Sequence, residues 1–131
     1  MRANGEFRFV CHVANFETTV SFYRDALSLE VVGGWDRGPD DCGMLFRAAS
    51  GIIEILRTHD REPPPTGAWL LIEISDITGL YQRVRNLGLT LREELCDTPW
   101  GHRRFVVTDP NGVNVAFFSY IGERELRDDQ S

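Results

Sequence analysis

Few side chains in this sequence suit metal or nucleophilic chemistry, and they are widely scattered. The three histidines are His12, His59 and His102. The three cysteines are Cys11, Cys42 and Cys96. Neither set has the close spacing of a zinc site, and three cysteines cannot all pair with one another, so we expect no disulfide framework. We therefore expect the protein to reside in a reducing cytoplasm. His12 shares a strand face with Arg8 and could carry a proton near neutral pH, although a single strand histidine often has only a structural role.

Charge and hydropathy argue against two classes of partner. The chain has 131 residues, and its 14 Lys and Arg against 20 Asp and Glu give a formal net charge of −6. Without a basic stripe it has nothing to neutralise phosphates, so we expect no nucleic-acid partner. No apolar run approaches the ~20 residues of a membrane span, and no signal-peptide core follows Met1, so we expect neither membrane insertion nor secretion. Neutral and cationic small molecules remain as ligands.

Hydrophobic periodicity predicts the same succession of elements twice. The predicted strands of the first half are 7–13, 30–35, 43–48 and 52–57. Those of the second half are 68–74, 89–95, 103–108 and 113–120. Each half has one helix after its first strand, capped by Asn15 and ending near Ser28, or capped by Asp76 and closed by Gly88. The turn 109–112 (DPNG) is assigned a structural role, because proline and Asn-Gly favour tight turns.

The two halves overlay at an offset of about 61 residues, which pairs Val13 with Ile74 and Gly51 with Gly112. A duplicated βαβββ unit is the economical interpretation. It predicts an α+β fold in a single domain, 1–131. The predicted parts are module one 7–58, a proline linker 59–67, module two 68–120 and a charged tail 121–131.

Two stretches carry a resemblance to a known family. The first runs from VANFE at 13–17 into FYRDALSL at 22–29, and the second from PWGHRRF at 99–105 to DPNG at 109–112. In this order, inside a repeated βαβββ pattern, they make the chain resemble the vicinal oxygen chelate superfamily of glyoxalase I, bleomycin-resistance proteins, fosfomycin-resistance enzymes and extradiol dioxygenases. The second stretch looks more like the bleomycin-resistance branch than the glyoxalase I branch. The resemblance implies two modules whose mostly antiparallel strands curl into a cup with helices outside.

In metal-using members, as the resemblance implies, each module contributes one ligand from its first strand and one from its fourth. The four matching positions here are Arg8, Glu54, Trp69 and Ala116. Only Glu54 could bind a metal, and a permanent cation beside it would repel one. We therefore expect neither a metal nor another cofactor, and this departure puts the metal-dependent activities of the family in doubt for this chain.

The resemblance also implies that a ligand binds inside the cup. Arg8 and Glu54 would form an ion pair in place of the metal, while strand parity puts aromatic side chains on the same surface. Trp35, Trp100 and His102 would lie at the rim. The expected ligand-binding residues are Arg8, His12, Trp35, Glu54, Trp69, Trp100, Phe118 and Tyr120. Such a lining suits a planar or cationic molecule through stacking or cation–π contact.

Two functions follow from this interpretation. The first is a metal-independent protein that binds a small molecule and sequesters a drug or metabolite without altering it. The alternative is an enzyme of the same fold: a metal-free one with His12, Arg8 and Glu54 as acid, electrophile and base, or a glyoxalase-like lyase, isomerase or dioxygenase that takes its metal through other ligands. The linker 63–65 (PPP) is stiff. It would hold the modules apart, so we expect two chains to pair as a homodimer.

Overall fold

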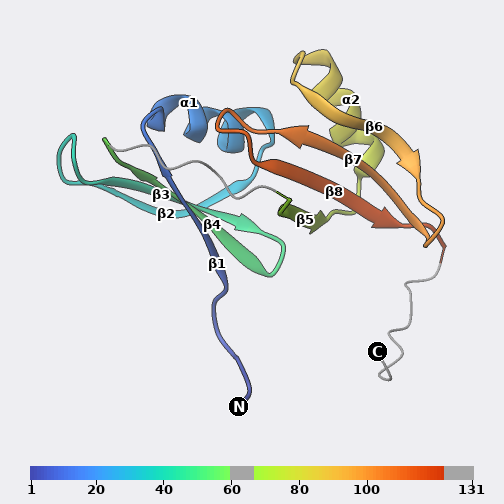
Figure 1. Cartoon of the computed structure of the whole chain (residues 1–131), viewed down its shortest axis with the longest axis horizontal. Helices are drawn as coiled ribbons and strands as arrows, with labels where there is room; N and C mark the ends of the chain where they lie inside the picture. The colour runs from blue at the N-terminus through green and yellow to red at the C-terminus, as the bar shows by residue number, and fades with distance from the viewer. Residues whose placement is uncertain (60–66, 123–131) are drawn as a thin grey trace. The chain divides into compact units, whose positions relative to one another are not determined.

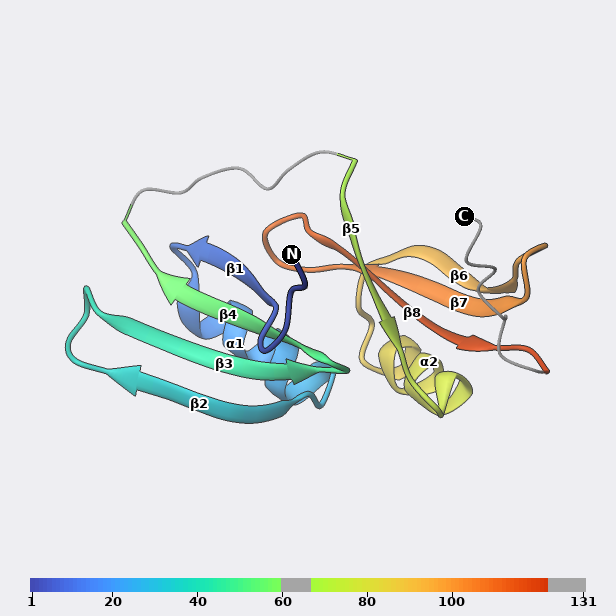
Figure 2. The same cartoon turned by 90° about the horizontal axis from the view of Figure 1, so that it is seen from below.

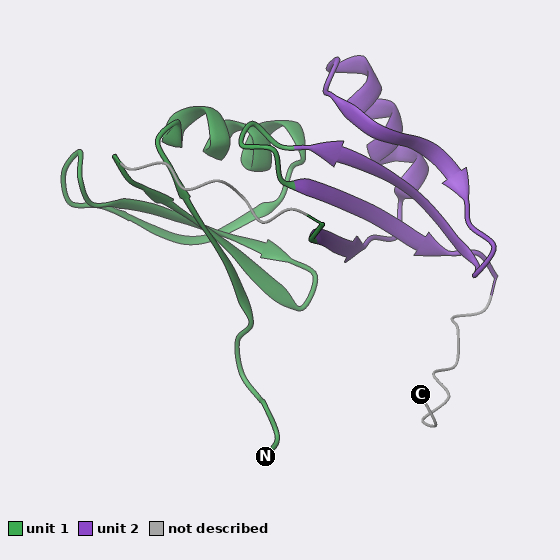
Figure 3. Ribbon diagram, in the orientation of Figure 1, with its two compact units in different colours: residues 1–68, 109–113 green, residues 69–108, 114–131 purple. Residues whose placement is uncertain are grey.

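The computed structural model describes residues 1–59 and 67–122. Most of the predicted proline linker and of the predicted charged tail lies outside the described residues. The chain forms two compact units (Figure 3). Unit 1 comprises residues 1–68 and 109–113, and unit 2 comprises residues 69–108 and 114–131. Among the described residues, no helix is long and apolar enough to cross a membrane.

Unit 1 is a four-stranded mixed sheet with a helix against one face (Figures 1 and 2). Its strands are β1 (Arg8–Val13), β2 (Glu30–Asp36), β3 (Cys42–Ala48) and β4 (Gly51–Arg57). They lie in the order β1-β4-β3-β2, and β1 is parallel to β4 while the other pairs are antiparallel. Alternation of burial along β4 follows from the pleat: Ile53 and Ile55 are buried on the helix side, and Glu54 faces the other way.

The helical segment of unit 1 differs from its prediction in two details. It begins as α1 (Phe16–Ser21) and continues as one π-helical turn, η1 (Phe22–Ala26). Asn15 stands at the N-cap, but its side chain caps no backbone N–H. Instead the buried Thr19 hydroxyl donates to Asn15, whose backbone carbonyl oxygen lies at 2.9 Å and whose side-chain oxygen lies at 3.0 Å.

Unit 2 repeats the arrangement. Its elements are β5 (Trp69–Glu73), α2 (Ile77–Asn86), β6 (Leu91–Asp97), β7 (His102–Thr108) and β8 (Asn114–Tyr120). The strand order is β5-β8-β7-β6, with β5 parallel to β8. Asp76 caps α2 as predicted, since its carboxylate accepts the Gly79 N–H at 3.0 Å. Figures 1 and 2 show α2 on one face of this sheet.

The strand registers show how closely the two halves correspond. In β1 and β4 Arg8 pairs with Ile52, and in β5 and β8 Trp69 pairs with Asn114. The duplicated βαβββ unit and the α+β class are confirmed. The strands form two four-stranded sheets, and each combines one parallel with two antiparallel pairs.

The turn that connects β7 to β8 belongs to unit 1. One carboxylate oxygen of Asp109 accepts the backbone N–H groups of Asn111 and Val113, at 2.8 and 2.9 Å. Its other oxygen accepts the hydroxyl of Tyr23 at 2.7 Å, and both residues are buried. The Asn111 amide donates to Thr19 at 2.9 Å. The DPNG segment is therefore a turn that anchors itself to the helical segment of unit 1.

Candidate functional site

Each sheet has one surface that its own helix does not cover, and we call this the helix-free face. In unit 1 the pleat places Arg8, Val10 and His12 of β1 on it, opposite the buried Val13 side. Glu54 of β4 lies beside Val10 in the register and shares this face. These side chains are exposed or half-buried, so unit 1 presents a mixed polar and apolar surface.

Arg8 and Glu54 form the ion pair that the sequence predicts. The distance from Arg8 Nη1 to Glu54 Oε1 is 2.8 Å, and Arg8 Nη2 also lies 2.8 Å from Glu6 Oε1. The pKa of Arg8 is raised above its usual value, first by the hydrogen bond to Glu54 and then by that to Glu6. Because Arg8 is partly exposed, the pair contributes little to stability.

The residues at the four family positions do not fit a divalent metal. Glu54 alone has a metal-binding group, and its carboxylate is bound by the Arg8 guanidinium. The corresponding positions of unit 2 hold an indole at Trp69 and a methyl group at Ala116. Within the described ranges, no group of three or more His, Cys, Asp and Glu side chains gathers as metal binding requires. No chemical step through a metal follows from this donor set.

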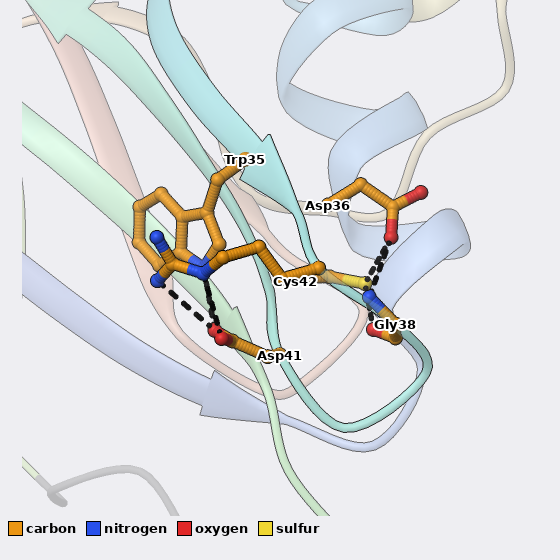
Figure 4. A network of polar contacts seen from close by, with 6 residues as sticks. Trp35, Asp36, Gly38, Asp41 and Cys42 are labelled. Carbon is orange, nitrogen blue, oxygen red and sulfur yellow. Dashed lines mark hydrogen bonds and ion pairs between the residues drawn. The ribbon is translucent and has the colours of Figure 1, made fainter.

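Trp35, Asp41 and Cys42 belong to a polar network at the β2–β3 turn (Figure 4). The indole Nε1–H of Trp35 donates to Asp41 at 2.8 Å. Its ring lies across Gly43, where any Cβ would collide with it. The Cys42 thiol donates to the Gly38 carbonyl at 3.0 Å, and burial raises its pKa above the usual value. Cys42 is therefore protonated and unreactive at neutral pH.

The histidines of unit 1 have separate surroundings. His12 is exposed on the helix-free face, and in the described part of the chain no hydrogen bond joins it to Arg8 or Glu54. His59 is exposed and pairs with Asp40. In the alternative enzyme hypothesis His12, Arg8 and Glu54 are the acid, the electrophile and the base. All three lie on the helix-free face, and among them a hydrogen bond joins Arg8 to Glu54.

Unit 2 gathers most of the predicted aromatic residues on its helix-free face. Register pairs His102 with Tyr120 and Arg104 with Phe118 across β7 and β8. The ring of His102 stacks on Phe118 with centroids 4.3 Å apart, and its edge meets Tyr120 at 4.9 Å. Phe118, expected to line an open surface, is only 8 % exposed because His102 covers it.

Arg104 lies against the two tryptophans of this face. Its guanidinium carbon is 5.5 Å from the Trp69 ring centroid and 5.4 Å from that of Trp100. Nε and Nη2 of Arg104 donate to the two carboxylate oxygens of Glu93 at 3.2 and 3.3 Å. The indoles keep 37 % and 51 % of their surface exposed, so each still offers contact area to a ligand.

His102 is more deeply placed than a rim residue. It is the first residue of β7 and is 8 % exposed. The indole N–H of Trp100 donates to His102 Nδ1 at 3.2 Å. Because an indole nitrogen can only donate, Nδ1 must accept, and the proton of the neutral imidazole then lies on Nε2. That buried Nε2 has no hydrogen-bond partner among the described residues.

Sequence reasoning did not include Arg104, Glu93 or a buried His102 in the ligand-binding set. Strand parity contained part of the signal, since Trp100, His102 and Arg104 alternate through the second family stretch. Parity identifies the face of the sheet on which Arg104 lies, but it does not identify Glu93 as its side-chain partner. The register of β6 against β7 is irregular: Glu93 pairs with Val106, Cys96 pairs with Arg104, and a register shift lies between them.

The two βαβββ units define the vicinal oxygen chelate class of fold. Residues 8–117 match the model of the Glyoxalase/Bleomycin resistance protein/Dioxygenase superfamily, and the chain belongs to that family.

Three solved structures illustrate the same fold. TioX from Micromonospora sp. ML1 is 15% identical, with a TM-score of 0.72 over 90% of this chain and 100% of its own. A glyoxalase/bleomycin resistance protein/dioxygenase from Nocardioides is 18% identical, with a TM-score of 0.73 over 98% and 91%. A glyoxalase/bleomycin resistance protein from Streptomyces sp. CB03234 is 19% identical, with a TM-score of 0.69 over 86% and 98%. These identities establish the fold alone. A search of curated protein sequences finds no match.

Proposed function

We propose that this chain is a metal-independent small-molecule-binding protein that sequesters a drug or metabolite with a planar ring system. The observation that carries this proposal is the helix-free face of unit 2. There Trp69 and Trp100 flank Arg104 with large parts of both indoles still exposed. Aromatic side chains in this setting bind planar molecules by stacking and by burying apolar area.

Removal of the Trp69 ring tests the proposal directly. We expect Trp69→Ala to weaken the binding of 2-naphthamide, a planar neutral probe, by about tenfold, and Trp69→Phe to have a smaller effect. Binding is followed through the indole N–H signals in a proton–nitrogen correlation spectrum of the full chain. Leu87→Ala is the matched control, because Leu87 is also exposed and apolar but ends α2. Equal affinities in the wild type and Trp69→Ala would contradict the proposal.

Metal independence is supported by the donor set around Glu54. Protein purified without added metal should contain no stoichiometric zinc, nickel, manganese or iron by elemental analysis. A chelator should leave its unfolding temperature unchanged, because no metal contributes to folding. A stoichiometric metal that disappears in Glu54→Gln would show that Glu54 is a ligand after all.

We propose further that two chains form a homodimer through the helix-free faces. Two apolar side chains on these faces are strongly exposed, Val10 at 43% and Leu71 at 51%. A second copy that covered them would remove this apolar surface from water. Sedimentation equilibrium at low micromolar concentration should report twice the monomer mass. Leu71→Arg should shift the protein toward monomer and Leu87→Arg should not, whereas a monomeric wild type would exclude the dimer.

A further inference from the structure

We propose that the unit 2 face selects planar molecules that carry a hydrogen-bond acceptor oxygen, and that His102 Nε2–H is the donor that recognises it. This inference rests on the proposed function and adds the chemistry of the ligand. It starts from a conflict in the structure: His102 is buried, its Nδ1 is used by Trp100, and its Nε2 has no partner among the described residues.

An unpartnered donor of this kind destabilises a protein that has no ligand. Buried polar groups are nearly always hydrogen-bonded, and each exception calls for a partner outside the chain or for water. The tautomer fixed by Trp100 makes His102 Nε2 a donor, so the missing partner must be an acceptor. A carbonyl or a carboxylate oxygen meets this requirement, and an ammonium group does not.

Arg104 favours the same chemistry. Nε and Nη2 are bound by Glu93, while Nη1 has no acceptor in the part of the chain that the structure describes. Its guanidinium already occupies the cation–π positions of both Trp69 and Trp100. A cationic ligand would therefore find both cation–π positions already occupied. The sequence predicts a planar or cationic ligand. These contacts favour a planar ligand that carries a hydrogen-bond acceptor oxygen.

We expect the Trp100 side chain to keep its hydrogen bond to His102 Nδ1 when the acceptor binds, because that bond holds the imidazole proton on Nε2. Trp100 is 51% exposed, it contacts both His102 and Arg104, and it lies in the turn that leads into β7. Gly101, the next residue, has a φ of 91°, which supports a tight turn without side-chain strain.

Three probes with the same naphthalene ring test the inference: 2-naphthamide, 2-naphthoate and 2-naphthylmethylammonium. We expect the amide to bind about tenfold more tightly than the ammonium. The naphthoate distinguishes a neutral from an anionic acceptor, and preference for either over the ammonium supports the proposal. Binding of all three with equal affinity, still weakened by Trp69→Ala, overturns the inference and leaves the proposed function intact. Absence of binding by every probe overturns both.

The donor itself is tested by His102→Phe, which keeps the stacking on Phe118. Amide affinity should fall about tenfold while ammonium affinity stays unchanged, and His59→Phe, at an exposed histidine, should alter neither. In the wild type a long-range proton–nitrogen spectrum should show the proton on Nε2, and the amide should shift that proton signal. This measurement needs no variant, and a proton found on Nδ1 overturns the inference.

Discussion

We expect the replacement of Asp109 by Ala to lower the free energy of unfolding by about 3 kcal/mol at neutral pH. The Asp109 carboxylate accepts the Tyr23 hydroxyl and the backbone N–H groups of Asn111 and Val113, all within unit 1. Alanine would leave these donors without acceptors, and the hydroxyl of Tyr23 is fully buried. Urea denaturation followed by circular dichroism measures the change.

Two variants separate the contributions of the carboxylate. Tyr23→Phe removes only the hydroxyl, so it should destabilise unit 1 less than Asp109→Ala does. In the double variant the two losses should not add, since both remove the same hydrogen bond. Asn111→Ala is the neighbouring control: it removes the 2.9 Å bond to Thr19 and keeps the backbone donors on Asp109. A loss below about 1 kcal/mol for Asp109→Ala would mean that water replaces the carboxylate.

The second large effect is alkaline destabilisation. Burial, followed by the charge of Asp109, raises the pKa of Tyr23 well above its usual value of 10.0. The same causes raise the pKa of Cys11 from 9.0 to about 12. The unfolded chain therefore loses these protons first, and the folded state holds them at higher pH. Stability is fully present well below pH 9 and falls as pH rises, by about 1.4 kcal/mol per pH unit once Cys11 titrates in the unfolded chain and by about 2.7 kcal/mol per pH unit once Tyr23 titrates there as well.

The composition makes this titration easy to interpret. The chain has no lysine. Arginine stays charged, so cysteine and tyrosine dominate proton release between pH 9 and 12. Urea midpoints measured at successive pH values should fall steeply in the wild type and less steeply in Tyr23→Phe and in Cys11→Ser. Cys96→Ser, at an exposed cysteine, should follow the wild type. A flat profile to pH 11 would contradict the raised pKa values.

Much of the fold is readable from local patterns. Alternating apolar residues predict each strand to within a few residues, and the capping aspartate and closing glycine predict α2. These signals are local because a pleat or a helical turn is set by neighbours in the chain. The prediction for the helical segment after Asn15 is less accurate. The Asn15 side chain caps no backbone N–H, and the second half of the segment is a π-helical turn. The buried Tyr23 of this turn bonds to Asp109, which is far away in the chain, so neighbouring residues carry no signal for its packing.

By itself, the sequence determined the repeated βαβββ pattern, the family and the face on which each strand residue lies. Tertiary structure alone decided which groups meet on that face: Arg104 between two indoles that lie far apart in the chain, and His102 with one ring nitrogen bonded and the other unpartnered. The physical reason is that strand periodicity fixes only the direction of a side chain. Its partners depend on inter-strand register, bulges and the rotamers of residues brought together by folding.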